Sequence, residues 1–117
     1  RRLGGRARQP GRGRHRLMHA IWLARLDKVR PVLILTREEV RSVRDLITVA
    51  PITSSVRGLT SEVLVGPDNG VDRASVANLD LITTIPRRSL IRPVGALLAD
   101  QEPYLTRAFH AAFDLEG

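Results

Sequence analysis

Two polar residues that could bind a phosphate stand at the ends of two apolar segments. Arg30 precedes Pro31 and an apolar segment that ends at Thr36, while Thr53 ends the apolar segment that begins at Leu46. A guanidinium is a permanent cation with a rigid fork of hydrogen-bond donors, and a hydroxyl adds one more donor. The two groups together are suited to holding a phosphate and to stabilising charge that develops on its oxygens.

These side chains can meet only if the two segments are neighbouring antiparallel strands. Pro31 biases the backbone of Arg30 toward an extended conformation, so Arg30 opens the first strand. If the connection over 37–45 turns the chain back on itself, the start of the first strand lies beside the end of the second. We therefore expect Arg30 and Thr53 at one rim of a sheet.

The rest of the chain predicts a sheet made of short strands. Apolar and β-branched residues recur in short runs between turn residues, and the sequence Pro-Asp-Asn-Gly at 67–70 is a strong turn signal. Frequent turns between short strands favour a mainly β fold, a small curved antiparallel sheet closing toward a barrel. The predicted strands cover 19–25, 31–36, 46–53, 61–65, 74–78, 81–85 and 92–97, with a helical turn over 38–43.

The last segment predicts a C-terminal helix. Apolar residues recur there at helical spacing, which puts them on one face. Asp100 is the expected N-cap, and Pro103 is tolerated in the first turn. We expect this face to seal one end of the barrel; the alternative is a separate docking helix. The residues of the face are Leu105, Ala108, Phe109, Ala112 and Phe113.

The formal charge divides the chain at Met18. Residues 1–17 hold seven arginines and no acid, whereas 18–117 hold twelve Lys or Arg against twelve Asp or Glu. We expect 1–17 to be a disordered basic tail and 18–117 to form a single domain. The tail is either non-native sequence upstream of a start at Met18 or a basic arm with nonspecific nucleic-acid affinity. A nucleic-acid site in the body must depend on a local arrangement of charge.

Composition also limits cofactors and location. The chain has no cysteine, and its three histidines are too scattered to ligate a metal, so we expect neither a metal nor another cofactor. The longest strongly apolar stretch, 32–35, is far shorter than the about 20 residues that span a bilayer. We expect a cytoplasmic protein without a membrane partner.

Several segments match one known pattern in order. They are 20–23, the Arg-Pro at 30–31, the Pro-Ile-Thr-Ser at 51–54, 70–76, 84–86 followed by Leu90, and 94–97 with the closing helix. As an ordered set over about residues 18–117 they resemble the MazF/PemK family of bacterial toxin endoribonucleases. The resemblance implies a sequence-selective, metal-independent endoribonuclease that cleaves single-stranded RNA by attack of the ribose 2′-OH. It further implies a homodimer that inhibits translation and growth, and a cognate antitoxin protein as partner.

The resemblance also assigns the residues of the site. Arg30 and Thr53 take the catalytic positions, with Arg30 orienting and stabilising the phosphate and Thr53 donating a hydrogen bond to it. In the family the matching arginine also takes part in proton transfer, although a guanidinium gives up a proton only with difficulty. The residues expected to bind RNA are Lys28, Ser54, Arg57, Arg73 and Ser75.

Two departures from the family pattern leave alternatives open. Ser75 stands where some relatives carry an acid that protonates the leaving oxygen, so the general acid is unidentified and Asp72 is a substitute. The connection at 26–29 is short where many relatives have a longer loop, which should open the groove.

Two other functions are alternatives to the endoribonuclease. One alternative is a gyrase-poisoning toxin of the same fold, which depends on a Trp-containing C-terminal tripeptide that the ending at 114–117 lacks. Another is a non-catalytic barrel that binds nucleic acid or protein.

Overall fold

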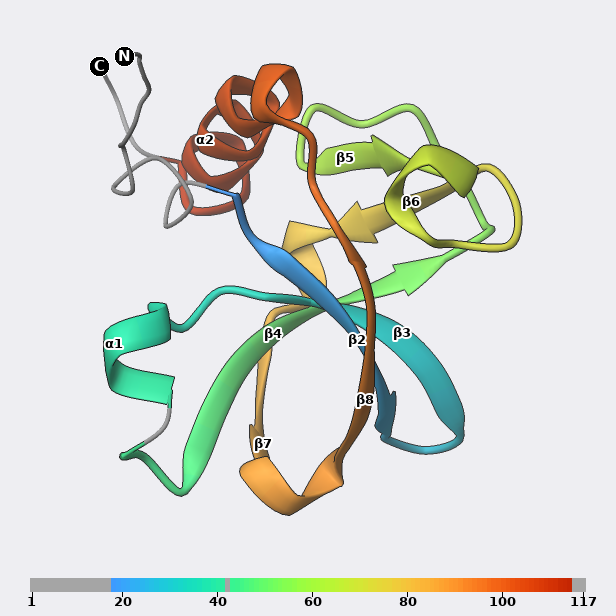
Figure 1. Ribbon diagram of the computed structural model, residues 1–117. Coiled ribbons are helices and arrows are strands. Elements are labelled where there is room, and N and C mark those ends of the chain that lie inside the picture. Colours follow the sequence, from blue (N-terminus) through green and yellow to red (C-terminus); the bar gives the residue numbers. More distant parts are fainter. Residues whose placement is uncertain (1–17, 42, 115–117) are drawn as a thin grey trace, which may run out of the picture.

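The structure is a computed structural model that describes residues 18–41 and 43–114 (Figure 1). The tail 1–17 lies outside the described residues. Among those described, no helix is long and apolar enough to cross a membrane. The strands are β2 (Ala20–Arg25), β3 (Val29–Ile34), β4 (Leu46–Thr53), β5 (Glu62–Val65), β6 (Ser75–Asn78), β7 (Thr83–Pro86) and β8 (Leu90–Ala96), and the α-helices are α1 (Glu38–Arg41) and α2 (Glu102–Ala112).

The strands form one strongly curved antiparallel sheet in the order β5-β6-β4-β3-β2-β8, with β7 paired to β4 off this path. β4 bends the sheet, because its first half pairs with β7 and its last two residues pair with β6. Figure 1 shows α2 beside β5 at one end of this half-barrel. The predicted fold class, a curved antiparallel sheet with a C-terminal helix, is confirmed.

Several strand boundaries differ from the prediction by one or two residues. β7 begins at Thr83 rather than at residue 81, because 79–81 form a 3-10 turn whose cap, Asn78, accepts a bond from the Asp80 N–H. β3 begins at Val29, so Arg30 is the second residue of its strand.

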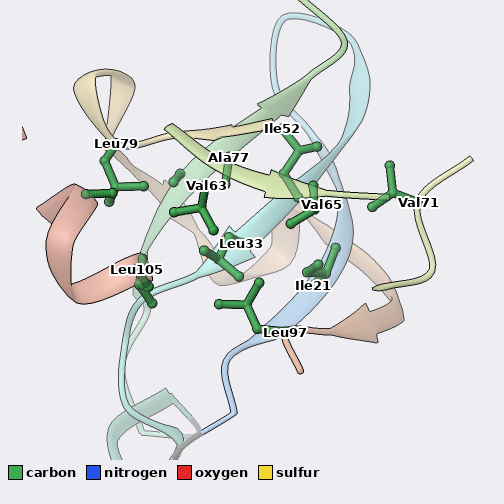
Figure 2. Close-up of a cluster of buried hydrophobic side chains, with 12 residues drawn as sticks. Ile21, Leu33, Ile52, Val63, Val65, Val71, Ala77, Leu79, Leu97 and Leu105 are labelled. Carbon is green, nitrogen blue, oxygen red and sulfur yellow. The ribbon is translucent and has the colours of Figure 1, made fainter. Parts of the chain in front are cut away.

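Two groups of buried side chains form the core. The larger fills the space between the curved sheet and α2 (Figure 2), where Leu33 and Leu97 lie near Leu105 of the helix. The smaller includes Val32, Ile47 and Ile85, and the partly buried Trp22 packs against it. Alternate residues of β3 and β4 thus face different groups, which is the period of a strand.

The helix α2 corrects two predictions. Its N-cap is Gln101, which makes no side-chain cap bond, and Asp100 lies in a preceding 3-10 turn. Leu105 and Ala108 are buried on the core, but Phe109 and Phe113 are 41% and 50% exposed. Their rings pack on each other, with centroids 4.8 Å apart. Only the part of the predicted face nearest the sheet therefore seals the barrel.

Candidate active site

A surface cavity of about 640 Å³ opens where four strands and one turn converge. Its walls come from β2, from the start of β3, from the end of β4, from the segment 70–75, and from β8. Four of its lining side chains are cationic and one is a carboxylate. The polar and charged lining residues are Lys28, Arg30, Thr53, Ser54, Asp72, Arg73, Ser75 and Arg92.

Arg30 and Thr53 line this cavity together, from adjacent strands. β3 pairs antiparallel with β4 in a register that sets Val32 opposite Pro51 and Ile34 opposite Val49. The same register, continued two residues past Val32, puts Arg30 opposite Thr53. The pairing that the sequence predicts is therefore the one that the sheet contains.

The guanidinium of Arg30 is partly buried and only partly paired. Its Nη2 donates to Asp27 Oδ2 at 3.2 Å, and the side chain is 23% exposed. Its Nε is buried and has no hydrogen-bond partner among the residues that the structure describes. An unmade bond of this kind costs about 1 to 3 kcal/mol. The guanidinium makes no other hydrogen bond with the described residues, so its terminal Nη donors keep capacity for an anion that enters the cavity.

The hydroxyl oxygen of Thr53 already accepts one hydrogen bond from the backbone. Its Oγ1 accepts a hydrogen bond from the backbone N–H of Ser55 at 3.1 Å. This bond fixes the oxygen at the end of β4 and leaves the hydroxyl proton available to an acceptor. The exposed Ser54 also lines the cavity.

The wall opposite β3 is held by a close backbone contact between Gly70 and Gly95. A Cβ on Gly70 would lie 1.9 Å from the Val94 carbonyl oxygen, and one on Gly95 would lie 1.9 Å from that of Asn69. Gly70 also has φ +84°, a conformation that favours glycine. The buried Asn69 adds hydrogen bonds to Ala96 O at 3.0 Å and Gln101 Oε1 at 2.6 Å. These contacts hold Asn69 and Gly70 against β8 and the turn that follows it.

Ser75 and Asp72, two side chains on this wall, differ in whether they can contact a substrate. The hydroxyl of Ser75 is buried and donates to the Arg73 carbonyl at 2.9 Å, so its proton is used within the protein. Asp72 is exposed and supplies the one carboxylate of the lining. Of the two positions considered for an acid, only Asp72 has an exposed side chain that can contact a substrate in the cavity.

Arg57 lies apart from the cavity lining. It is exposed in the loop that follows β4, where the Glu62 carboxylate accepts N–H bonds from three successive residues. The donors are Arg57 at 3.1 Å, Gly58 at 2.8 Å and Leu59 at 3.2 Å. The structure therefore brings together Arg30, Thr53, Lys28, Ser54, Arg73 and Ser75, but not Arg57.

Arg92 is a cavity residue that the sequence reasoning missed. It belongs to β8 and pairs with Leu23, itself a lining residue. A signal was present, since Arg92-Pro93 repeats the Arg-Pro dipeptide of 30–31. Only the pairing of β8 with β2 brings the two dipeptides to the same cavity, and this long-range contact is invisible in a local pattern.

The cavity gives the formally neutral body a local positive charge. Lys28, Arg73 and Arg92 have no ion pair with any residue that the structure describes. In the same described residues, no group of three or more His, Asp or Glu side chains could hold a metal ion. The arrangement suits a polyanion whose phosphate meets Arg30 and Thr53.

Comparison with known proteins identifies the family of the chain. Residues 19–113 match the model of the PemK-like, MazF-like toxins of type II toxin–antitoxin systems. The chain is 54% identical over 99 residues to endoribonuclease MazF3 of Mycobacterium tuberculosis, a match that covers 85% of this chain and 96% of that one. The solved Mycobacterium tuberculosis toxin MazF-mt6 is 53% identical, with 84% and 99% of the two chains covered and a TM-score of 0.81.

The fold extends to more distant relatives. An endoribonuclease from a mycobacterial species, solved in complex with its cognate antitoxin, has a TM-score of 0.75 at 19% identity, covering 84% of this chain and 94% of that one. The chain belongs to the PemK-like, MazF-like family of toxins of type II toxin–antitoxin systems. Its enzyme class within that family is endoribonuclease, the activity of its curated relatives.

Proposed function

We propose that the chain cleaves single-stranded RNA at a phosphodiester held between Arg30 and Thr53. The observation that carries this proposal is the shared cavity in which Arg30, whose terminal Nη atoms make one hydrogen bond with the described residues, lies on the strand next to Thr53. The bound phosphate satisfies the donors that the protein leaves open. The ribose next to that phosphate carries its own nucleophile, so a well-placed set of donors can suffice.

The proposed reaction is an internal transfer at phosphorus. The 2′ oxygen forms a bond to phosphorus as the bond to the 5′ oxygen breaks. The 2′ proton passes to a water molecule, and the 5′ oxygen gains a proton from the protein. The products are a 2′,3′-cyclic phosphate and a 5′-hydroxyl end. Charge that develops on the nonbridging oxygens meets Arg30 and Thr53, and a donor of this kind contributes about 3 to 4 kcal/mol to the barrier reduction.

The proposal that no metal takes part rests on the chemistry of the lining residues. Four cations and one carboxylate are suited to binding phosphate oxygens directly, whereas a divalent cation needs several oxygen ligands. Asp72 is the proposed source of the proton for the leaving oxygen. Ser75 holds the wall that carries Arg73, through its bond to the Arg73 carbonyl.

We further propose that the active form is a homodimer. A second cavity, of about 610 Å³, lies between α1, β4, β7 and α2 and is lined in part by the exposed rings of Phe109 and Phe113. Leu46, also in this lining, is 58% exposed. A second copy of the chain would cover these apolar side chains and remove them from water.

The proposed role in the cell follows from the family. A toxin of a toxin–antitoxin system has a cognate antitoxin, and we propose that an antitoxin segment competes with RNA for the cationic cavity. Free toxin would then cut RNA at selected sequences in the cytoplasm and stop translation and growth. The shape of the cavity walls would select the bases.

The test is cleavage of a long RNA by the purified protein in excess chelator, followed by mapping of the cut ends. We expect discrete cuts that leave 5′-hydroxyl ends. The matched control is Arg88→Ala, which removes an exposed arginine outside the cavity and should cut normally. Intact RNA with stalled gyrase complexes, or RNA bound without cuts, would overturn the proposal in favour of another class.

A further inference from the structure

Arg92 lines the cavity but has no role in the proposed reaction. It is exposed, lines the cavity together with Pro93 and Val94, and has no carboxylate partner among the described residues. The other arginine that begins an Arg-Pro dipeptide, Arg30, is tied to Asp27. Arg92 is therefore a cation that is free to bind an anion.

The sheet separates Arg92 from the pair on β3 and β4. Leu23 of β2 pairs with Arg92 on one side and with Pro31 on the other. Neighbouring strands are about 4.8 Å apart, so in this curved sheet β8 and β3 are separated by at most about 10 Å, and β8 and β4 by at most about 14 Å. A phosphate that bridges Arg30 and Thr53 is therefore held by two strands that do not pair with β8.

The segment 70–75 joins the two ends of the cavity. Gly70 rests against the carbonyl of Val94 in β8, and Ser75 directly precedes Val76, which pairs with Thr53. The cavity thus has the Arg30–Thr53 pair at one end and Arg92 of β8 at the other. One phosphate cannot satisfy both ends, but successive phosphates of one strand can.

We propose that Arg92 binds a backbone phosphate of the RNA that flanks the scissile one, as a second phosphate subsite. The inference rests on the proposed function and extends it to the path of the substrate. This subsite binds the substrate before the reaction and equally in the transition state, since no charge develops at a flanking phosphate. Its loss should therefore act on KM and leave kcat unchanged.

The experiment uses an oligonucleotide that spans one mapped cut site, with Arg92→Ala compared to wild type and to Arg88→Ala. We expect Arg92→Ala to raise KM about tenfold with kcat within about twofold, because a charge-assisted hydrogen bond is lost. The slope of log(kcat/KM) against log salt should fall by about 0.7, the value for one phosphate contact on a single strand. Arg92→Lys should restore the slope, and Arg88→Ala should change neither quantity.

A second measurement identifies the phosphate. Oligonucleotides with one neutral methylphosphonate at each flanking position should include one that raises the KM of wild type about tenfold and that of Arg92→Ala no further. A wild-type KM for Arg92→Ala, an equal defect in Arg88→Ala, or additive defects at every position would overturn the subsite. If Arg30→Ala still abolishes cleavage in that case, the proposed function survives; if wild type cuts no RNA, both fail.

Discussion

The Nη2 atom of Arg30 lies 3.2 Å from a carboxylate oxygen of Asp27, three residues earlier in the hairpin between β2 and β3. Asp27 is 73% exposed, so this ion pair contributes about 0 to 1 kcal/mol to stability. Its effect on the site is larger, because the carboxylate occupies one donor of Arg30 and repels an incoming phosphate. The short connection at 26–28 holds this carboxylate beside the proposed phosphate site.

Replacing Asp27 tests this relationship. We expect Asp27→Asn to lower KM for RNA about threefold, since a negative charge near the phosphate is removed. The free energy of unfolding should change by less than about 0.5 kcal/mol. Steady-state kinetics and urea titration measure the two quantities. A higher KM would mean that the carboxylate orients Arg30 productively and does not compete with the substrate.

Thr53 should depend on its hydroxyl and not on its size. Thr53→Val has nearly the same shape without the donor, and we expect cleavage to fall by at least about 100-fold. Thr53→Ser keeps the hydroxyl and should retain activity within about tenfold. Single-turnover cleavage of one RNA measures both variants. Equal rates for valine and wild type would remove Thr53 from the mechanism.

Arg30 should need both its charge and its fork of donors. We expect Arg30→Ala to lower kcat by at least about 100-fold, and Arg30→Lys to recover only part of this loss, because an ammonium keeps the charge but not the planar geometry. Circular dichroism should show an unchanged fold in both variants. An alanine variant that cuts at the wild-type rate would contradict the proposed site.

Asp72 should matter only when the leaving oxygen needs a proton. We expect Asp72→Asn to lower kcat on ordinary RNA by about 100-fold, the scale of general acid catalysis. A substrate with sulfur in place of the 5′ oxygen has a leaving group that needs no protonation, and it should be cut equally by both proteins. The same defect on both substrates would show that Asp72 acts in another way.

The contribution of the contact between Gly70 and Val94 to stability can be measured by comparing Gly70 with Gly58, which has a similar backbone angle but no close contact. Gly58 has φ +78° and open space around it, whereas Gly70 has φ +84° and no room for a Cβ. We expect Gly58→Ala to cost about 1 to 2 kcal/mol from the angle alone. Gly70→Ala should cost at least about 2 kcal/mol more, because the backbone of β8 must move. Urea titration gives both values, and equal costs would mean that the contact with Val94 relaxes easily.

The exposed rings on α2 predict where two copies meet. We expect Phe109→Asp to convert the dimer to a monomer, since a charge in an apolar interface must lose its hydration. Tyr104→Asp changes an exposed aromatic residue of the same helix outside the second cavity and should leave the dimer intact. Sedimentation velocity distinguishes the two results. A monomeric wild type, or a dimeric Phe109→Asp, would refute this interface.

The sequence by itself determined most of the secondary structure and the pairing of β3 with β4. The curved antiparallel sheet was predictable because apolar runs and turn residues act over a few positions. The neighbourhood of Arg30 and Thr53 was predictable because consecutive strands joined by a short connection pair in few ways. Counting the charges also showed that a nucleic-acid site in the neutral body must depend on a local arrangement of charge.

Only the tertiary structure decided which segments that are distant in the sequence line the same cavity. Arg92 reaches the cavity because β8 pairs with β2, and the segment 70–75 forms a wall of the same cavity because Gly70 meets Gly95 without side chains between them. Leu105 and Phe109 have the same helical spacing, yet the first is buried and the second is exposed. Periodicity tells which residues share a face, but how much of that face is covered depends on contacts between segments far apart in the chain.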